Sequence, residues 1–174
     1  MITIYLAKMN SGLSSHELLF RAVANHSGGR SFTLSYERGK KPFFVESDAP
    51  RFSISHSKDV WICAISDREI GCDVQIQVPY PRFASVAKRY FHPVEIEEMN
   101  AASSPLSIFF DIWAKKEAVA KLTGRGLDQT LREARLADLP LFVHSITLPI
   151  DAPYSAAVAS YDSFDVAEIS LKKI

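Results

Sequence analysis

The sequence predicts an α+β protein that combines short strands with several helices. Apolar and polar residues alternate in short runs, which is typical of half-buried strands. A later stretch instead spaces its apolar residues at helical intervals, between a proline and a glycine. With 174 residues, 47% of them hydrophobic, the chain can bury a substantial core as one domain or as two small lobes.

The first half of the chain is expected to contain mainly strands. In order, we expect a strand over 2–6, a helix from Ser14 to Asn25, a short strand over 32–36, a basic loop over 37–50, and strands over 52–56, 60–65 and 70–76. The helix begins at a capping box, Ser14-Ser15-His16-Glu17, and ends before two glycines. The tight connection Ser66-Asp67-Arg68 before the last strand predicts an antiparallel hairpin.

The second half is expected to be helical first and then to return to strands. We expect helical segments near 82–90 and 93–100, a long helix over 105–122, and strands near 141–147, 154–160 and 165–171. The long helix begins at Ser104, with Pro105 in its first turn, and ends near Gly124.

Composition narrows the classes of function. Lys plus Arg and Asp plus Glu each number 20, so no overall field favours nucleic acid or a membrane surface as a partner. The N-terminal residues lack the pattern of a signal peptide, and no run approaches the length of a membrane span. We therefore expect a cytoplasmic protein in which Cys63 and Cys72, both within apolar strand patterns, are reduced packing residues.

The strand over 70–76 carries the first candidate functional residues. Ile70, Cys72, Val74 and Ile76 alternate with Gly71, Asp73 and Gln75. Since successive side chains of a strand point to opposite faces, Asp73 and Gln75 share the face opposite the core. We expect Asp73 to be exposed in a cleft.

The long helix carries the second group. Trp113, Glu117 and Lys121 follow one another at four-residue steps and lie on one face. Asp73 facing Glu117 can hold Mg²⁺, which prefers a few carboxylates together with phosphate oxygens and water, while Lys121 meets the remaining anion. The alternative is a surface ion pair between Glu117 and Lys121, with Asp73 merely solvated.

Four segments in order resemble the Sfp-type 4′-phosphopantetheinyl transferases. The family's signatures are (I/V)G-x-D-x-E and (F/W)-x-x-K-E-(A/S)-x-x-K, together with F-N-(I/L)-S-H-S and G-K-P. The corresponding segments are Ile70-Gly71-Cys72-Asp73, Trp113-Ala114-Lys115-Lys116-Glu117-Ala118 with Lys121, Phe52-Ser53-Ile54-Ser55-His56-Ser57, and Gly39-Lys40-Lys41-Pro42. Gln75 departs from the pattern, which usually has Glu at that position.

The resemblance implies a fold and an activity. The fold has two similar α/β halves related by a pseudo-twofold axis, here residues 1–72 and 73–174, with the active site near residue 72; the run 154–160 echoes 60–66. The activity is Mg²⁺-dependent transfer of the 4′-phosphopantetheine group of coenzyme A to a serine of an apo acyl or peptidyl carrier protein, with release of 3′,5′-ADP. This is the reaction of a holo-[acyl-carrier-protein] synthase, and one chain with both halves can perform it as a monomer.

The resemblance also assigns roles to residues. The implied sets are Asp73, Gln75 and Glu117 for the metal, Lys41, Pro42, Ser55, His56 and Lys121 for coenzyme A, and Glu117 with Lys121 for catalysis. Glu117 is our choice of general base, acting directly or through a water molecule. Without a charge on Gln75, the metal would have two protein carboxylates instead of three.

The carrier protein needs a basic and apolar surface. The segment from Arg82 to Phe91, which contains Lys88-Arg89, offers both kinds of residue just after the metal strand. Two other classes stay open on the sequence: a metal-dependent nucleotide hydrolase using the same carboxylates, and a non-catalytic carrier-binding module disabled at Gln75.

Overall fold

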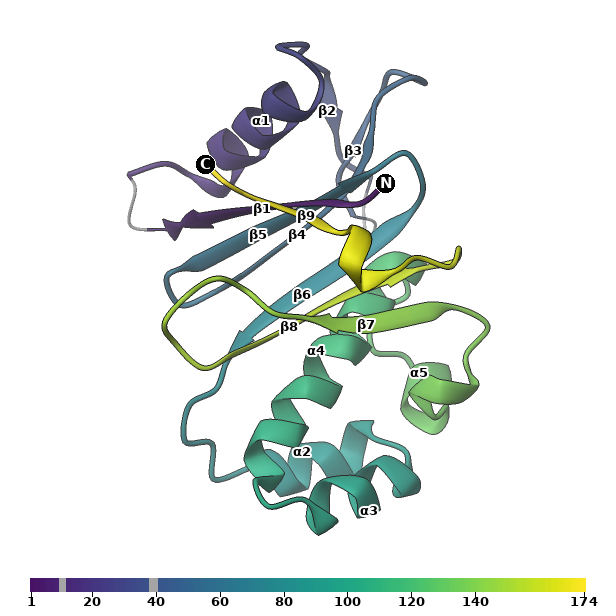
Figure 1. Ribbon diagram of the computed structural model, residues 1–174. Coiled ribbons are helices and arrows are strands. Elements are labelled where there is room, and N and C mark those ends of the chain that lie inside the picture. The colour runs from purple at the N-terminus through teal and green to yellow at the C-terminus, as the bar shows by residue number, and fades with distance from the viewer. Residues whose placement is uncertain (10–11, 38–40) are drawn as a thin grey trace.

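The computed structural model describes residues 1–9, 12–37 and 41–174. It shows a four-stranded and a three-stranded β-sheet with helices on their outer faces, together with a short two-stranded one (Figure 1). The strands are β1 (Thr3–Lys8), β2 (Leu34–Ser35), β3 (Phe43–Phe44), β4 (Arg51–Ser57), β5 (Val60–Ser66), β6 (Ile70–Ile76), β7 (Phe142–Ile146), β8 (Tyr154–Ser160) and β9 (Ser170–Lys173). The helices are α1 (Ser15–His26), α2 (Phe83–Tyr90), α3 (Pro93–Ala101), α4 (Pro105–Thr123) and α5 (Gln129–Glu133), with 3₁₀ turns at Leu136–Asp138 and Val166–Glu168. The predicted α+β class is confirmed.

The larger sheet has the strand order β4-β5-β1-β9, and the smaller one has the order β6-β8-β7. Strands β4 and β5 form an antiparallel hairpin, β5 pairs antiparallel with β1, and β9 lies parallel to β1. In the smaller sheet β8 runs antiparallel to both of its neighbours. A short hairpin of β2 and β3 lies beside α1 and the end of the larger sheet (Figure 1).

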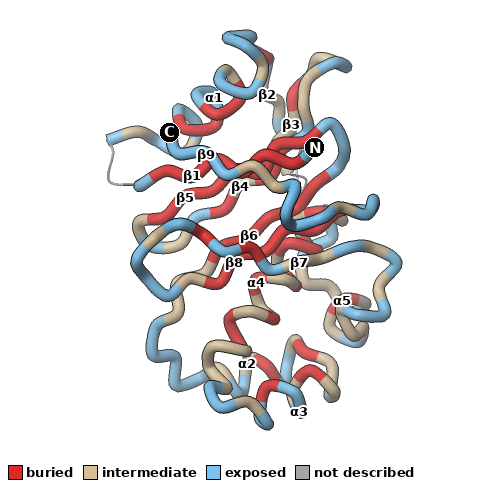
Figure 2. The backbone as a smooth tube through the Cα atoms, viewed as in Figure 1, coloured by how far each residue is buried: buried red, intermediate tan, exposed pale blue. Residues whose placement is uncertain are grey.

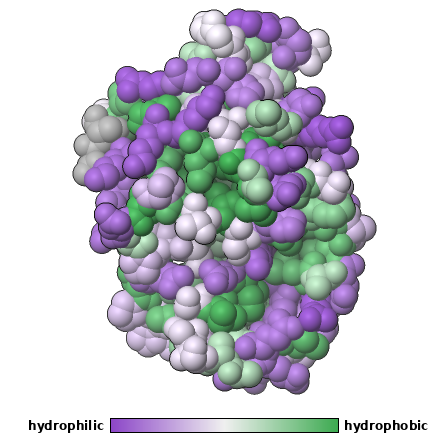
Figure 3. Space-filling model, in the orientation of Figure 1, coloured by the Kyte–Doolittle hydropathy of each residue, from purple (hydrophilic) through white to green (hydrophobic). Residues whose placement is uncertain are grey.

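Both faces of the larger sheet are covered by other elements, which explains why its central strands are continuous apolar runs in the sequence. One face of the larger sheet packs Tyr5 and Trp61 against α1, while its other face packs Ile4 and Ile62 against the smaller sheet. Helix α4 covers the outer face of the smaller sheet. Every residue of β5 is therefore buried, and the buried segments concentrate in the sheets (Figure 2). On the face seen in Figure 3, hydrophilic residues are interspersed with smaller areas of hydrophobic ones.

The predicted hairpin across Ser66-Asp67-Arg68 is wrong. Both edges of β5 are already hydrogen-bonded, one to β4 and the other to β1, so no edge is left for β6. The chain instead passes into the smaller sheet, where β6 pairs with β8 along its whole length.

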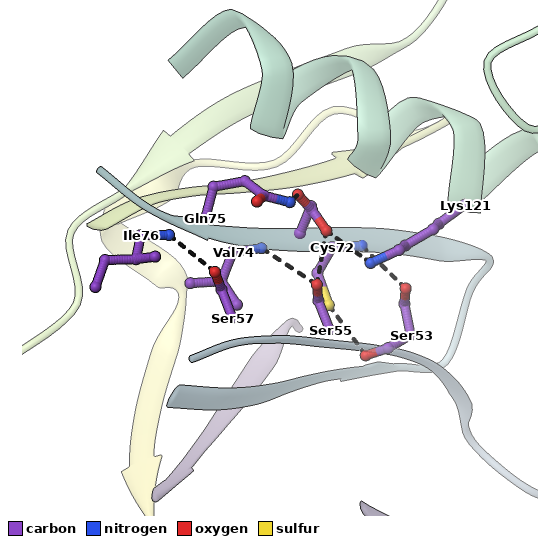
Figure 4. Close-up of polar contacts among 9 residues, drawn as sticks. Ser53, Ser55, Ser57, Cys72, Val74, Gln75, Ile76 and Lys121 are labelled. Atoms are coloured by element: carbon purple, nitrogen blue, oxygen red, sulfur yellow. Dashed lines mark hydrogen bonds and ion pairs between the residues drawn. The ribbon is translucent and has the colours of Figure 1, made fainter. Parts of the chain in front are cut away.

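The two sheets meet where β6 lies over β4, and serine hydroxyls join them (Figure 4). The backbone amides of Cys72, Val74 and Ile76 donate to the hydroxyls of Ser53, Ser55 and Ser57 at 3.0, 3.4 and 3.0 Å, respectively. We call these three contacts the serine seam. They satisfy amides of β6 that point away from β8, and buried amides rarely remain without an acceptor.

Helix α4 begins and ends as the sequence predicts. Ser104 is its N-cap, Pro105 lies in its first turn, and Gly124 ends it in the left-handed conformation with φ of 68°. Alanines 114 and 118 bring its backbone close to the smaller sheet. At the closest point, a β-carbon added to Gly71 would lie 2.0 Å from the carbonyl oxygen of Ala118 and 2.7 Å from the amide nitrogen of Leu122.

The start of α4 also carries a small helical layer formed with α2 and α3. Phe91, Phe109 and Trp113 form its aromatic centre, with Phe109 stacked on both other rings at centroid distances of 5.4 and 5.9 Å. The described helices include none that is both long and apolar enough to cross a membrane.

Several boundaries differ from the expected ones. The last expected strand, 165–171, begins as a 3₁₀ turn capped by Asp165 and becomes β9 only at Ser170, where β1 offers an open edge. Because β9 belongs to the larger sheet, the chain returns to the layer in which it began. The division at residue 72 and the pseudo-twofold axis stay predictions.

The two cysteines are confirmed as buried and free. Burial raises the pKa of both thiols, and the Cys72 sulfur donates to the carbonyl oxygen of Ser53 at 3.0 Å. Both side chains therefore contribute packing and not nucleophilic chemistry.

Gly71→Ala should lower the free energy of unfolding by about 3 kcal/mol or more, because the atoms that the new methyl group meets are backbone atoms that cannot rotate away. Gly28→Ala is the control: its β-carbon meets nothing within 4 Å, and its φ of 64° adds only a left-handed backbone penalty of about 1 kcal/mol. Denaturant unfolding compares the two variants. A loss at Gly71 no larger than that at Gly28 would contradict the close contact between α4 and β6.

Candidate functional site

Asp73 lies at the centre of the candidate site, and its carboxylate has three donors. Ser55 Oγ and Lys121 Nζ both contact Oδ1, at 2.6 and 2.7 Å, and the Gln75 side-chain amide donates to Oδ2 at 2.8 Å. Figure 4 shows Ser55 approaching from β4 and Lys121 from α4. Asp73 is thus held by residues from both sheets and from the helix.

The expectation that Asp73 would be exposed in a cleft is wrong. The residue is only 2% exposed. Alternation along β6 does turn it away from the core between the sheets, but α4 covers that second face as well. A buried carboxylate needs charged or hydrogen-bonding partners, and Lys121 and Ser55 provide them.

Glu117 places a second carboxylate beside Asp73. Its side chain is half-buried on α4, and burial raises its pKa above the ordinary glutamate value. The charge of Asp73 raises this pKa further, while the Lys121 ammonium lowers it. The structure therefore brings together Asp73, Glu117 and Lys121. Lys121 forms an ion pair with Asp73 on β6 and is not limited to a surface ion pair with Glu117.

The donor set fits a hard divalent cation. Asp73 and Glu117 supply carboxylate oxygens, and Gln75, whose amide nitrogen is turned to Asp73, has its carbonyl oxygen left as a ligand. Among the described residues, no group of three His, Cys, Asp or Glu side chains forms a metal cluster. Mg²⁺ commonly uses one or two carboxylates and completes its shell with water and phosphate oxygens, so two carboxylates suffice.

The residues expected to contact coenzyme A are spread over two places. His56 is exposed on β4, and it points to the opposite face from the buried Ser55 because the two are neighbours in one strand. Lys41 precedes β3, and its ammonium reaches the start of β6. There it contacts Glu69 at 2.8 Å and the carbonyl oxygen of Ile70 at 3.1 Å. Pro42, half-buried, follows it. Gly39 and Lys40 of the same motif lie outside the described residues.

Sequence reasoning missed the role of Lys116. Its ammonium is fully buried and contacts Glu95 at 3.0 Å and the carbonyl oxygens of Leu131 and Ala134 at 2.9 and 3.1 Å. Glu95 in turn accepts from the amides of His92 and Leu136, so this ion pair ties α3 and the segment after α5 to α4. The helical spacing could have indicated that Lys116 is buried, because it lies four residues from both Ile112 and Ala120 on the buried face of α4.

The segment that contains these residues matches a known family. A model of the 4′-phosphopantetheinyl transferase superfamily matches residues 69–166, which include β6, α4 and β8. The chain belongs to this superfamily. The resemblance seen in its motifs is thereby confirmed.

Individual members of the superfamily are also similar to the chain. The 4′-phosphopantetheinyl transferase HetI of Nostoc sp. is 37% identical over 114 residues, covering 62% of this chain and 47% of that protein. A 4′-phosphopantetheinyl transferase of Bacillus subtilis is 31% identical over 120 residues, covering 66% and 53%. AcpT of Escherichia coli K12, also a 4′-phosphopantetheinyl transferase, is 32% identical over 107 residues, covering 60% and 55%. The chain spans about half the length of the curated relatives it matches.

In the metal-free protein, Glu117 should titrate above the ordinary glutamate pKa. Asp73→Asn should lower its pKa by removing a like charge, and Lys121→Met should raise it by removing an opposite one. Because the raised pKa belongs to the folded state, the contribution of Glu117 to stability is complete at pH below its unfolded pKa and is lost as the pH rises through the folded value. Carboxyl carbon shifts followed by NMR against pH measure each value. An ordinary pKa in the wild-type protein would contradict the site.

Proposed function

We propose that this protein transfers 4′-phosphopantetheine from coenzyme A to a serine of an apo acyl or peptidyl carrier protein, with Mg²⁺, and releases 3′,5′-ADP. The observation that carries the proposal is the convergence of Asp73 from β6 with Glu117 and Lys121 from α4. Membership in the superfamily and the names of the relatives support the same reaction. A holo-[acyl-carrier-protein] synthase type of activity, a monomeric state and a cytoplasmic location belong to this proposal.

Each residue then has a chemical task. Asp73, Glu117 and the carbonyl oxygen of Gln75 would hold Mg²⁺, which supplies positive charge next to the phosphate oxygens when bound. The serine oxygen of the carrier attacks the phosphorus that bears pantetheine, and the bond from this phosphorus to the 3′,5′-ADP oxygen breaks. Glu117 takes the proton that the serine loses. Its half-buried position on α4, beside Asp73, is where a general base could take that proton.

The cationic residues serve the phosphates. Lys121, whose ammonium lies 2.7 Å from Asp73 Oδ1, is in position to meet negative charge that develops on the leaving group. His56 presents an exposed imidazole for a phosphate of coenzyme A, and Lys41 and Pro42 border its adenosine end. Glu69 is shared by Lys41 and Arg51, at 2.8 and 3.4 Å, so these three side chains together keep one positive charge.

The carrier protein would dock on α2 and α5. Lys88 and Arg89 are exposed on α2, and the guanidinium groups of Arg89 and Arg132 lie 5.2 and 5.5 Å from the centre of the Tyr90 ring. The Tyr90 ring meets the Trp113 ring edge to face at 5.6 Å, one helical turn before Glu117. The contact between Tyr90 and Trp113 thus links the proposed docking surface to α4, and its positive charges would complement an acidic helix on the carrier.

Intact mass measurement of an apo carrier protein, incubated with coenzyme A, Mg²⁺ and this protein, tests the proposal. The carrier should gain one phosphopantetheine group. Asp73→Asn and Glu117→Gln should each lower kcat/KM by about 100-fold or more, because they remove a metal ligand and the base. Glu97→Gln, an exposed position on α3, is the matched control and should leave kcat/KM unchanged.

The alternatives give different results in the same assay. Breakdown of coenzyme A without any change in carrier mass would indicate a nucleotide hydrolase. An unmodified carrier that nevertheless binds, with coenzyme A intact, would indicate a non-catalytic module. Either result with several acyl and peptidyl carriers would overturn the proposed transfer.

A further inference from the structure

Ser55 differs from the two other serines of the seam. Ser53, Ser55 and Ser57 each accept one backbone amide of β6, so all three contribute to joining the sheets. Of these three serines, Ser55 also contacts Asp73: its hydroxyl donates to Oδ1 at 2.6 Å. Both partners are buried, Ser55 being 7% exposed and Asp73 2%.

We propose that Ser55 is a positioning residue that fixes the orientation of the Asp73 carboxylate for metal binding. This inference rests on the proposed function, since it assigns Asp73 to the metal. The contacts with coenzyme A that the resemblance implies for Ser55 and His56 stay predictions. The two side chains lie on opposite faces of β4.

The hydrogen-bonding capacity of a serine hydroxyl supports the assignment. A hydroxyl has one hydrogen to donate, and Ser55 gives it to Asp73. Its oxygen accepts a hydrogen bond from the Val74 amide at 3.4 Å, and this second contact restricts the orientation of the hydroxyl. Both contacts lie in a buried place, where they are shielded from competition by water.

The direction of the contact explains how Ser55 acts through Asp73. Ser55 and Lys121 both hold Oδ1, while the Gln75 amide holds Oδ2, so the plane of the carboxylate is fixed from both ends. Ser55 is the donor supplied by the larger sheet, since Gln75 lies on β6 and Lys121 on α4. A cation that displaces Lys121 would leave Ser55 as the donor that still holds Oδ1. Donors of this kind typically change metal affinity by about 10- to 100-fold when removed.

Mn²⁺ binding followed by electron paramagnetic resonance tests the assignment without any turnover, since Mn²⁺ shares the preference of Mg²⁺ for oxygen ligands. Ser55→Ala should weaken Mn²⁺ binding by about tenfold or more. Ser57→Ala is the matched control: it removes an acceptor from the same seam, and its affinity should change by less than about twofold. Ser55→Thr keeps the hydroxyl and should restore most of the affinity. Equal Mn²⁺ affinities in Ser55→Ala and Ser57→Ala would overturn the assignment.

A double-mutant cycle measures the same contact independently of metal. In guanidinium unfolding, Ser55→Ala and Asp73→Ala should be coupled by about fivefold or more in the unfolding equilibrium constant, whereas Ser57→Ala and Asp73→Ala should be additive. If Ser55→Ala does not fold, Ser55→Cys, which keeps the size of the side chain but donates weakly, replaces it in both experiments. Equal coupling in the two cycles would contradict the assignment.

The two proposals fail in different ways. Wild-type protein that modifies no carrier, with Ser55 and Asp73 still coupled, would count against the transferase function alone. Normal transfer, with Ser55→Ala indistinguishable from Ser57→Ala in Mn²⁺ affinity and coupling, would count against Ser55 alone.

Discussion

The serine seam is the interaction on which the rest of the structure depends. Strand β5 uses both of its edges within the larger sheet, so β6 cannot extend that sheet and must be held some other way. Hydroxyls of β4 provide the acceptors that a neighbouring backbone would otherwise supply. Their two-residue spacing matches the spacing of the outward amides of β6, which explains why serines alternate in Phe52-Ser53-Ile54-Ser55-His56-Ser57.

The placement of β6 in turn fixes the candidate site. Gly71 lets the backbone of α4 approach β6 closely, and this approach brings Glu117 and Lys121 to Asp73. Two carboxylates in a partly buried place repel each other, and Lys121 offsets part of that repulsion. The buried pair of Lys116 and Glu95 anchors the opposite side of α4, so Glu117 lies between two ion pairs that hold its helix. Such support from surrounding residues is what a preorganised site requires.

The sequence was informative where periodicity and local capping decide the structure, as in α4, whose start at Ser104 and end at Gly124 are confirmed. It was also sufficient for the family, because the motifs around Asp73 and Glu117 are contiguous. It could not show that α4 buries Asp73, since alternation tells which face a residue is on but not what covers that face. The partner of β6 and the role of Ser55 depend on which strand edges are already occupied, and this is a property of the whole sheet. The pseudo-twofold relation of the halves stays a prediction.

Hydrogen exchange of the backbone amides of β6, followed residue by residue by NMR in the wild-type protein, tests the serine seam most directly. If the seam holds the sheets together, the amides of Cys72, Val74 and Ile76 should exchange as slowly as those of β6 that bond to β8, because all are hydrogen-bonded and shielded from water. If these three amides instead exchanged at the rate of an open sheet edge, the result would contradict the seam and with it the placement of Asp73 that depends on the seam.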